Sequence, residues 1–272
     1  MNSMQQYLNP LNLDRLRTQF QTADPFPFIA IDDFLKDDLA RKIASEYPGM
    51  SGAREQGHAF SAVNERGKVQ ITDPDHFGPS TRALYEVLAS SEWLSALEYV
   101  SGIPKLLADE ELVGGGMHLM GSGGHLDVHI DFNLLPKRQL FRRLNILVFL
   151  NEQWEKEWGG RIELWDPQVR VRRQAFTPVL NRCVIFETSD RSYHGVERVQ
   201  CPKDRARQSF AGYYYTSDPP AGWDGKRHST VFKPRPDERI KGGILMPASR
   251  VANALARPFR KLSRLASKTF ER

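Results

Sequence analysis

The sequence predicts a mainly β protein with supporting helices (α+β), in which one helical layer covers one antiparallel β core. Before the C-terminal tail, helical periodicity is found in the first half of the chain. From about residue 111, short runs rich in β-branched and aromatic residues alternate with loops that contain Gly, Pro, Asn and Asp, which is typical of a sandwich or barrel. The 272 residues, of which 40% are hydrophobic and 26% charged, are enough to bury a full core without disulfides.

The first half contains one predicted strand and two predicted helices. The segment FIAI at 28–31 has the composition of a short strand. A helix is expected to begin near Asp37, because Leu39, Ile43 and Ala44 then share one face. A second helix is expected over residues 80–102.

The second half contains the runs that we expect to form the β core: LNILVFLN, GGRIELWD, VRRQAF, RCVIFET and SFAGYYYTS. We predict one domain over residues 1–217, with helical support from 1–110 and the β core from 111–217. Residues 218–248 are dense in Pro, Gly and charge, so we expect an irregular connector there. No internal repeat is present.

The net charge of +5 is concentrated at the C-terminal end of the sequence. Residues 249–272 contain seven Lys and Arg and one Glu, a net charge of +6, so the remaining 248 residues carry −1. A nearly neutral body argues against nucleic-acid binding by the main fold.

Residues 258–271 have the pattern of a basic amphipathic helix with Pro258 in its first turn. Such a helix can lie on an anionic membrane surface. The alternative is that its apolar stripe docks on the protein's own body or on a second subunit. The apolar residues on one side are Phe259, Leu262, Leu265, Ala266 and Phe270, and the cations on the other are Arg260, Lys261, Arg264 and Lys268.

The low cysteine content, and an N-terminal sequence without the pattern of a secretory signal, favour a reducing compartment. Cys183 and Cys201 are too few for a disulfide framework. The N-terminal residues have no basic region followed by an apolar one, and no apolar run of about 18 residues could span a bilayer. We therefore expect a cytoplasmic protein, with peripheral contact to the inner face of a membrane if the tail binds lipid.

The segment GGHLDVHIDFN at 123–133 contains two His-x-Asp pairs. In an extended strand, side chains at i and i+2 share a face, so each pair can offer an imidazole and a carboxylate to one ion. A ferrous ion that also binds a co-substrate and oxygen uses two His and one carboxylate on one side. His194, which follows the apolar run RCVIFE, is the candidate for the second His, and Arg207 opens a later strand where it could hold a ligand carboxylate.

The order of these elements resembles the 2-oxoglutarate and Fe(II)-dependent oxygenases, in particular the prolyl 4-hydroxylase-like branch. The resemblance covers about residues 25–217 and is strongest over 115–216. It implies a double-stranded β-helix (jelly-roll) core, with His129, Asp131 and His194 as the iron ligands. The matching pieces are HIDFN, RRLNILVFLN, WGGRIELWD, FETSDRSYHGV and RQSFAGYYY.

The resemblance also selects one His-x-Asp pair. His129 and Asp131 stand where the family has its metal pair, after the Gly-Gly turn and before a loop, whereas His125 and Asp127 come too early. On a regular strand His125 and Asp127 would share the face of His129 and Asp131. These two residues then either contribute to the mouth of the metal-binding pocket or are ordinary polar residues at the start of the strand.

Arg207, rather than Arg205 on the same strand face, matches the residue that pairs with the distal carboxylate of 2-oxoglutarate. Two departures from prolyl hydroxylases affect the site: Leu126 and Phe149 stand where these enzymes often have Tyr. Arg207 then needs another residue to take part in binding the carboxylate of 2-oxoglutarate. Asn145, on the face of Phe149, is our candidate for it, and the alternative is that Asn145 is a satisfied buried amide.

The resemblance implies an enzyme that uses Fe(II), 2-oxoglutarate and O2 to hydroxylate an unactivated C–H bond, with decarboxylation of 2-oxoglutarate to succinate. An intact Asp131 favours hydroxylation over halogenation, while desaturation or cyclisation would use the same ligands. The substrate is expected to be a small molecule or a peptidyl residue. A non-catalytic jelly-roll binding module remains the competing class, and a cupin-type isomerase would require a His-x-His pair and a further Glu, which are not in place.

Overall fold

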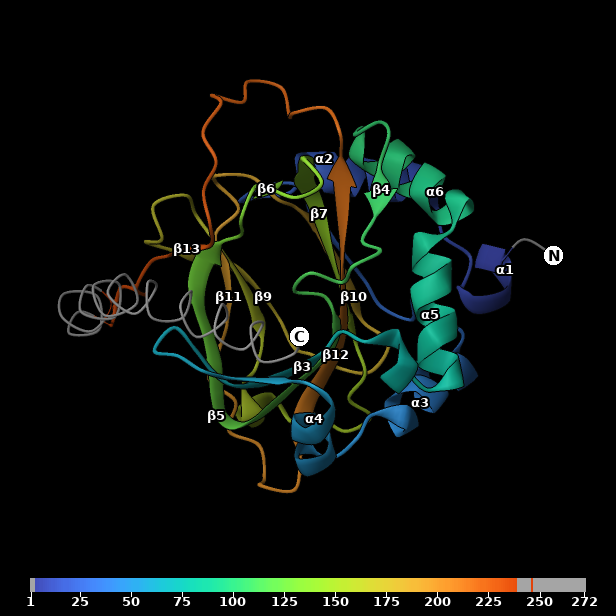
Figure 1. The fold of residues 1–272 in the computed structure, drawn as a ribbon, viewed down its shortest axis with the longest axis vertical. Helices are drawn as coiled ribbons and strands as arrows, with labels where there is room; N and C mark the ends of the chain where they lie inside the picture. Colours follow the sequence, from blue (N-terminus) through green and yellow to red (C-terminus); the bar gives the residue numbers. More distant parts are fainter. Residues whose placement is uncertain (1–2, 239–245, 247–272) are drawn as a thin grey trace, which may run out of the picture.

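The computed structural model describes residues 3–238 and residue 246. Helices gather on one side of a curled antiparallel sheet (Figure 1). The helices are α1 (Ser3–Tyr7), α2 (Leu13–Thr22), α3 (Asp37–Glu46), α4 (Met50–Gln56), α5 (Pro79–Ala89) and α6 (Ser91–Ser101), with short 3₁₀ turns at Pro74–His76 and Lys156–Trp158. Within these residues no helix has the length and apolar character needed to cross a membrane.

The strands follow the order β1-β10-β7-β12-β5-β11-β8-β9, with further short strands attached to β3, β5, β7 and β12. Their bounds are β1 Phe28–Ile31, β2 His58–Ser61, β3 Glu65–Ile71, β4 Leu107–Ala108, β5 Gly116–Ile130, β6 Leu134–Leu135, β7 Leu140–Phe149, β8 Ile162–Trp165, β9 Arg172–Phe176, β10 Cys183–Glu187, β11 His194–Val196, β12 Ala206–Thr216 and β13 Val231–Phe232.

β5 belongs to both layers of the core. Its first part pairs with β12 over Gly116–Gly121, and its second part pairs with β11 near His129. The glycine-rich stretch between the two parts includes Gly123, which has a φ of +80° that glycine adopts without strain. The strand therefore passes from one layer to the other, and the predicted mainly β fold with a jelly-roll core is confirmed.

Strand alternation divides the buried residues into two sets. Leu144, Ile146 and Val148 of β7 face the helices, in one core cluster with residues of α3, α5 and α6. Phe149 and Ile162 belong to a second cluster between the two layers. The side chains that face this second region are therefore available to form an internal cavity.

The structure corrects the single helix expected over residues 80–102. Ser90 has an extended backbone (φ −69°, ψ 150°) and its hydroxyl accepts a hydrogen bond from the backbone N–H of Trp93. It therefore caps α6 and separates it from α5. The strand at 28–31 and the helix that begins at Asp37 are as predicted. The predicted amphipathic helix at 258–271 lies outside the described residues.

Candidate metal centre and co-substrate pocket

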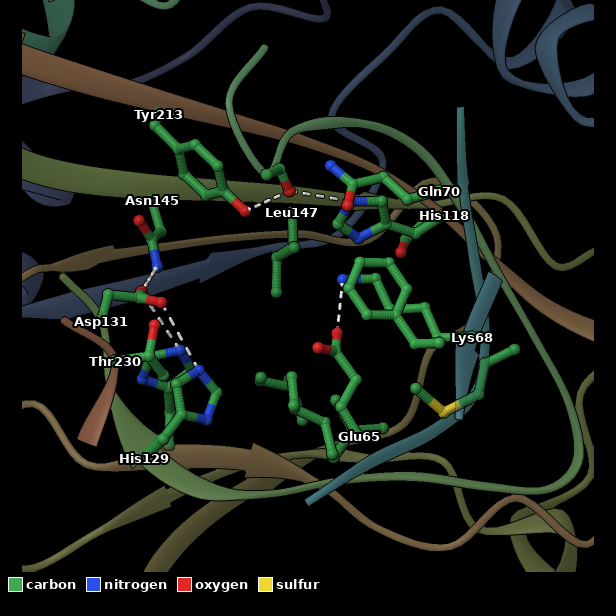
Figure 2. A pocket seen from close by; sticks show the side chains of 18 of the residues that line it. Glu65, Lys68, Gln70, His118, His129, Asp131, Asn145, Leu147, Tyr213 and Thr230 are labelled. Carbon is green, nitrogen blue, oxygen red and sulfur yellow. Dashed lines mark hydrogen bonds and ion pairs between the residues drawn. The ribbon is translucent and has the colours of Figure 1, made fainter. Parts of the chain in front are cut away.

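The two sheet layers enclose a cavity of about 290 Å³. Asp131, His129 and Asn145 lie on one side of it, while Gln70 and His118 lie on the opposite side (Figure 2). Much of the remaining lining is apolar: Phe60, Met120, Leu126, Phe132, Leu147, Ile162, Phe186, Val196 and Phe232. A few polar groups that converge in a mainly apolar cavity are typical of a small-molecule site.

The structure brings His129, Asp131 and His194 together at one end of this cavity. His129 on β5 and His194 on β11 are direct cross-strand partners, and Asp131 follows the end of β5. Nε2 of His129 lies 3.5 Å from Oδ1 of Asp131, and Nε2 of His194 lies 3.5 Å from Oδ2. One ligand atom from each residue lies within 4.8 Å of the others.

The two imidazoles are oriented by backbone carbonyl groups. Nδ1 of His129 lies 2.8 Å from the carbonyl oxygen of Asp127, and Nδ1 of His194 lies 2.9 Å from that of Ser192. In the neutral tautomer Nδ1–H donates to the carbonyl, so the lone pair is on Nε2, which faces Asp131. Burial, together with the positive charge that His129 can carry, lowers the pKa of His194 to about 4, so its ring is neutral at pH 7.

Asp131 is ionised and is held by two donors. Nδ2 of Asn145 donates to Oδ2 of Asp131 at 2.8 Å, and Nη2 of Arg142 lies 3.1 Å from the same oxygen. Burial raises the pKa of this carboxyl, but the charge of Arg142 and the interactions with the imidazoles of His194 and His129 outweigh burial and keep the pKa well below its ordinary value. The carboxylate therefore has the charge and orientation that a cation requires.

Simple strand alternation does not predict that Arg142 faces the cavity, because β7 is irregular beside it. The pairing of β12 with β7 shifts by one residue between Tyr214 and Tyr215, so Arg142 and Asn145, three positions apart, face the same cavity. Nε of Arg142 donates to Oδ1 of Asn145 at 3.0 Å. Its guanidinium lies between two aromatic rings, 3.4 Å from the ring centroid of Tyr213 and 4.7 Å from that of Phe132.

The contacts of Asn145 are at the metal end of the cavity. Its amide nitrogen donates to Asp131, and its oxygen accepts hydrogen bonds from Arg142 and from the hydroxyl of Thr188. These contacts satisfy the amide as a buried group and orient a candidate metal ligand. A direct role of Asn145 in binding 2-oxoglutarate beside Arg207 stays a prediction.

Arg207 lines the cavity, and only 4% of its surface is exposed. Nε donates to the carbonyl oxygen of Gly160 at 2.7 Å and Nη1 to the hydroxyl of Ser209 at 3.3 Å, while Nη2 has no hydrogen-bond partner among the described residues. The guanidinium lies 4.9 Å from the ring centroid of Phe149. Burial lowers its pKa to about 10, so it keeps its charge at pH 7. An unpaired, buried N–H of a fixed cation fits an anionic ligand.

Arg205 and the first His-x-Asp pair lie outside the cavity. The side chain of Arg205 is 53% exposed. His125 and Asp127 were expected to share a face with His129, and this expectation is wrong. The pairing of β5 with β11 shifts between Leu126 and His129, which places Leu126 in the cavity and turns His125 toward an outer groove.

The segment after β12, predicted to be an irregular connector, also contributes to the cavity. β13 pairs with β5 beside His129, and the ring of Phe232 lies 5.3 Å from the ring of His129. Thr230 also lines the cavity. Arg235 then anchors the segment, because its guanidinium donates to Glu163 at 2.7 Å and to the carbonyl oxygen of Val196 at 3.1 Å.

The donor set fits a ferrous ion and an anionic co-substrate. Two imidazoles and one carboxylate on one side of an ion leave its other positions open, which is the arrangement of non-haem iron oxygenases. Arg207, in the same cavity, offers a buried cation for a carboxylate. Bound iron and 2-oxoglutarate would supply the oxidative chemistry.

Comparison with known proteins gives the same family. The sequence model of the 2OG-Fe(II) oxygenase superfamily matches residues 115–215. The mouse (Mus musculus) protein named prolyl 3-hydroxylase OGFOD1 is 28% identical over 97 residues, which are 34% of this chain. The matched segment is only 16% of the length of the mouse protein.

Solved structures agree in fold. A Pseudomonas putida prolyl-4-hydroxylase is 16% identical, with a TM-score of 0.55 over 75% of this chain and 98% of that one. The non-haem alpha-ketoglutarate-dependent carbocyclase SnoK, from nogalamycin biosynthesis, is 12% identical, with a TM-score of 0.53 over 86% of this chain and 93% of that one. Residues 115–215 of this chain therefore match the 2OG-Fe(II) oxygenase superfamily, whose chemistry uses Fe(II), 2-oxoglutarate and O2, and the chain resembles the prolyl 4-hydroxylase-like branch in fold.

Proposed function

We propose that this protein is an Fe(II)- and 2-oxoglutarate-dependent dioxygenase that hydroxylates an unactivated C–H bond of its substrate, with decarboxylation of 2-oxoglutarate to succinate. One observation carries the proposal: His129, Asp131 and His194 converge in the same buried cavity as the unpaired guanidinium nitrogen of Arg207.

Each part of the cavity has a separate task in this proposal. His129, Asp131 and His194 hold the iron, and Arg207 binds the distal carboxylate of 2-oxoglutarate through Nη2. The apolar walls, including Leu147, keep bulk water away from the reacting groups. Phe149 has no hydroxyl to offer the co-substrate, so it supports the guanidinium of Arg207 by packing alone.

The cavity supports a substrate whose reacting part is small. A volume of about 290 Å³ is at the lower end of the range for ligand sites, and the co-substrate must share it. A small molecule or the side chain of a peptidyl residue meets this limit. Desaturation or cyclisation of the substrate is the alternative outcome, because it would use the same ligands as hydroxylation.

The proposal is tested by anaerobic titration of the metal-free protein with Fe(II) and 2-oxoglutarate, followed by the weak visible charge-transfer band of the chelate. Asp131→Ala should abolish the band. Arg207→Ala should preserve metal binding. The concentration of 2-oxoglutarate needed for the band should rise by about 30-fold or more, because the buried carboxylate of the co-substrate loses its cationic partner. Arg205→Ala, one residue before β12, is the control, and we expect it to behave as the wild type.

The opposite outcomes separate the alternatives. Absence of the band in the wild-type protein would favour the non-catalytic binding module. A band that survives Asp131→Ala but disappears in Asp127→Ala would move the metal to the first His-x-Asp pair. Under air, a substrate should stimulate the release of succinate. A product heavier than the substrate by one oxygen atom would then distinguish hydroxylation from desaturation.

We further propose a cytoplasmic protein whose C-terminal residues 249–272 contact the inner face of a membrane. The charge and apolar pattern of those residues support this proposal. The full-length chain should sediment with anionic vesicles, and removal of 249–272 should abolish sedimentation. Equal behaviour of the two proteins would favour docking of the segment on the protein itself or on a second subunit.

A further inference from the structure

An ion pair lies in the wall of the cavity, outside the metal centre and the contacts of Arg207. Nζ of Lys68 lies 2.9 Å from Oε1 of Glu65, and the two side chains are only 10% and 18% exposed (Figure 2). Nζ of Lys68 also lies 4.8 Å from the ring centroid of Phe60. All three side chains line the cavity.

A bulge in β3 puts both charges on the cavity side. Residues three positions apart on a regular strand face opposite sides. Lys68 is paired with Phe60 and Arg66 with Ser61, so Gly67 is an extra residue in the pairing of β3 with β2. Arg66 is consequently exposed, whereas Glu65 and Lys68 both face the cavity.

Only glycine fits the bulge. Gly67 has a φ of +69°, and a Cβ at this position would lie 2.8 Å from the Cα of Gly124. Bulges of this kind are frequent beside active sites, where they redirect a side chain. The bulge is therefore the structural device that directs Lys68 toward the cavity.

Strand register relates the pair to both the strand of His129 and the strand of Arg207. Glu65 lies opposite Leu126, three residues before His129 on β5. Lys68 lies opposite Met120, which is in turn opposite Arg207 on β12. Both charges therefore face the same cavity as His129 and Arg207.

The charge of Lys68 also acts on His118, which lies on the same wall of the cavity. Burial lowers the pKa of His118 well below its ordinary value, and the positive charges of Lys68 and Arg207 lower it further. His118 is therefore neutral, and its Nε2 lies 3.0 Å from the carbonyl oxygen of Gly114. Among the described residues that line the cavity, Glu65 is the acid outside the metal centre, so the pair offers one anion and one cation to a ligand.

The pair is poorly explained by stability alone. Desolvation of two charges offsets most of the attraction between them, so a buried ion pair adds little stability compared with apolar side chains. Glu65 and Lys68 also lie on an added strand outside the eight-strand order of the core. Charges maintained in the wall of a ligand cavity are instead suited to recognition.

We propose, resting on the oxygenase function above, that Glu65 and Lys68 bind a small zwitterionic substrate of the free α-amino acid type. The ammonium group of the substrate pairs with the carboxylate of Glu65, and its carboxylate pairs with the ammonium of Lys68. A zwitterion replaces the ion pair with two new ion pairs, so no buried charge is left without a partner. A peptide residue, which has neither charge on its backbone, cannot make this exchange.

The test uses the full-length protein loaded anaerobically with Fe(II) and 2-oxoglutarate. The probes are the free L-amino acids and, for those that respond, their N-acetyl and carboxamide derivatives. The readouts are the shift of the charge-transfer band on probe binding and, under air, the stimulation of succinate release. The variants are Glu65→Gln, Lys68→Met and the swapped pair Glu65→Lys with Lys68→Glu, and Arg66→Gln is the outward-facing control on the same strand.

We expect at least one free amino acid to shift the band, and its N-acetyl and carboxamide derivatives to bind about tenfold more weakly or worse, because each lacks one charge-assisted contact. Each single variant should lower the affinity for the free amino acid by a similar factor. The concentration of 2-oxoglutarate that gives half-saturation should stay within about twofold of the wild-type value. The swapped pair, which retains an internal ion pair, should also lose the response. Arg66→Gln should retain it.

Three outcomes would overturn this inference while leaving the oxygenase intact: a chelate band with no response to any free amino acid, derivatives that bind as well as the free amino acid, or a swapped variant that responds as the wild type does. The last outcome would assign the pair a structural role. Absence of the chelate band itself would overturn the oxygenase function and the inference with it.

Discussion

Asn145 and Asp131 are joined by a hydrogen bond of 2.8 Å from Nδ2 to Oδ2, and Arg142 adds a second donor to the same oxygen. Oδ2 of Asp131 is therefore held by two protein donors. The other oxygen, Oδ1, faces Nε2 of His129 and is not the oxygen that these two donors hold. Such contacts fix the orientation of a ligand before the metal arrives.

This arrangement predicts that Asn145→Leu weakens metal binding by about tenfold to 100-fold, the usual effect of removing a partner of a metal ligand. The variant removes the amide donor to Asp131 and the acceptor for Arg142. Isothermal titration with Fe(II) under anaerobic conditions measures the affinity. Thr188→Val removes only a hydrogen bond of 3.2 Å to the same amide and should have a smaller effect. Equal affinity of Asn145→Leu and wild type would contradict the assignment.

The two His-x-Asp pairs are predicted to differ completely in metal binding. His129→Ala should abolish it, because Nε2 of His129 is one of the three converging donors. His125→Ala should preserve it, because this side chain faces the outer groove. The visible spectrum of the Co(II)-substituted protein reports the coordination in both variants. Loss of the Co(II) spectrum in His125→Ala alone would place the metal at the other pair.

Arg235 is predicted to hold the segment that carries Phe232 beside the metal centre. Arg235→Met removes the contacts with Glu163 and with the carbonyl oxygens of Leu126 and Val196. Hydrogen exchange of the backbone amides should then accelerate in residues 226–238, including that of Lys233, which donates to the carbonyl of Val128. Arg173→Met, which removes an exposed ion pair with Asp24, is the control, and equal exchange in the two variants would be evidence against the anchor.

Glu46 is predicted to stabilise the start of α5 in a pH-dependent manner. Gly78 at the N-cap has no side chain, and the carboxylate of Glu46 accepts from the backbone N–H groups of Ser80 and Thr81 at 2.7 Å each. Burial raises the pKa of Glu46, but these hydrogen bonds outweigh burial, and the pKa lies below its ordinary value of 4.5.

A lowered pKa in the folded state means that the ionised carboxylate stabilises the fold above pH 4.5 and that this stabilisation is lost as the pH falls through the folded-state pKa. Glu46→Gln should therefore reduce the free energy of unfolding by about 0.5–1 kcal/mol at pH 7, the usual effect of a negative charge at a helix N-terminus. The difference should shrink toward acidic pH. Urea unfolding at several pH values measures it, and a difference that does not depend on pH would exclude the charge as its cause.

Local sequence patterns were sufficient for five strands of the β core and for the candidate ligands, but not for β2, β3 and β4 within the part expected to be helical support. Runs of β-branched and aromatic residues between turn residues gave the positions of β7, β8, β9, β10 and β12, because burial on both faces of a sheet selects those residue types. The spacing of His129 and Asp131 and the place of Arg207 at the start of a strand are likewise local features. The folded chain brings these positions into one cavity, and their roles stay predictions.

The sequence could not place residues that lie beside irregularities in the strands. Simple alternation assigns His125 to the face of His129, Arg142 to the face opposite Asn145, and Lys68 to the face opposite Glu65. Each assignment fails because an extra residue in one strand reverses the alternation beyond it. The cause is the pairing with a strand distant in the sequence, which no local pattern contains.

By itself the sequence determined a mainly β chain with a helical cover and a His-x-Asp pair of the kind that binds iron. Only the tertiary structure decided that His125 faces an outer groove, that Asn145 and Arg142 hold Asp131, and that the segment after β12 returns beside His129. The physical reason is that hydrophobic pattern and turn chemistry act over a few residues, whereas the register between strands depends on contacts across the whole chain.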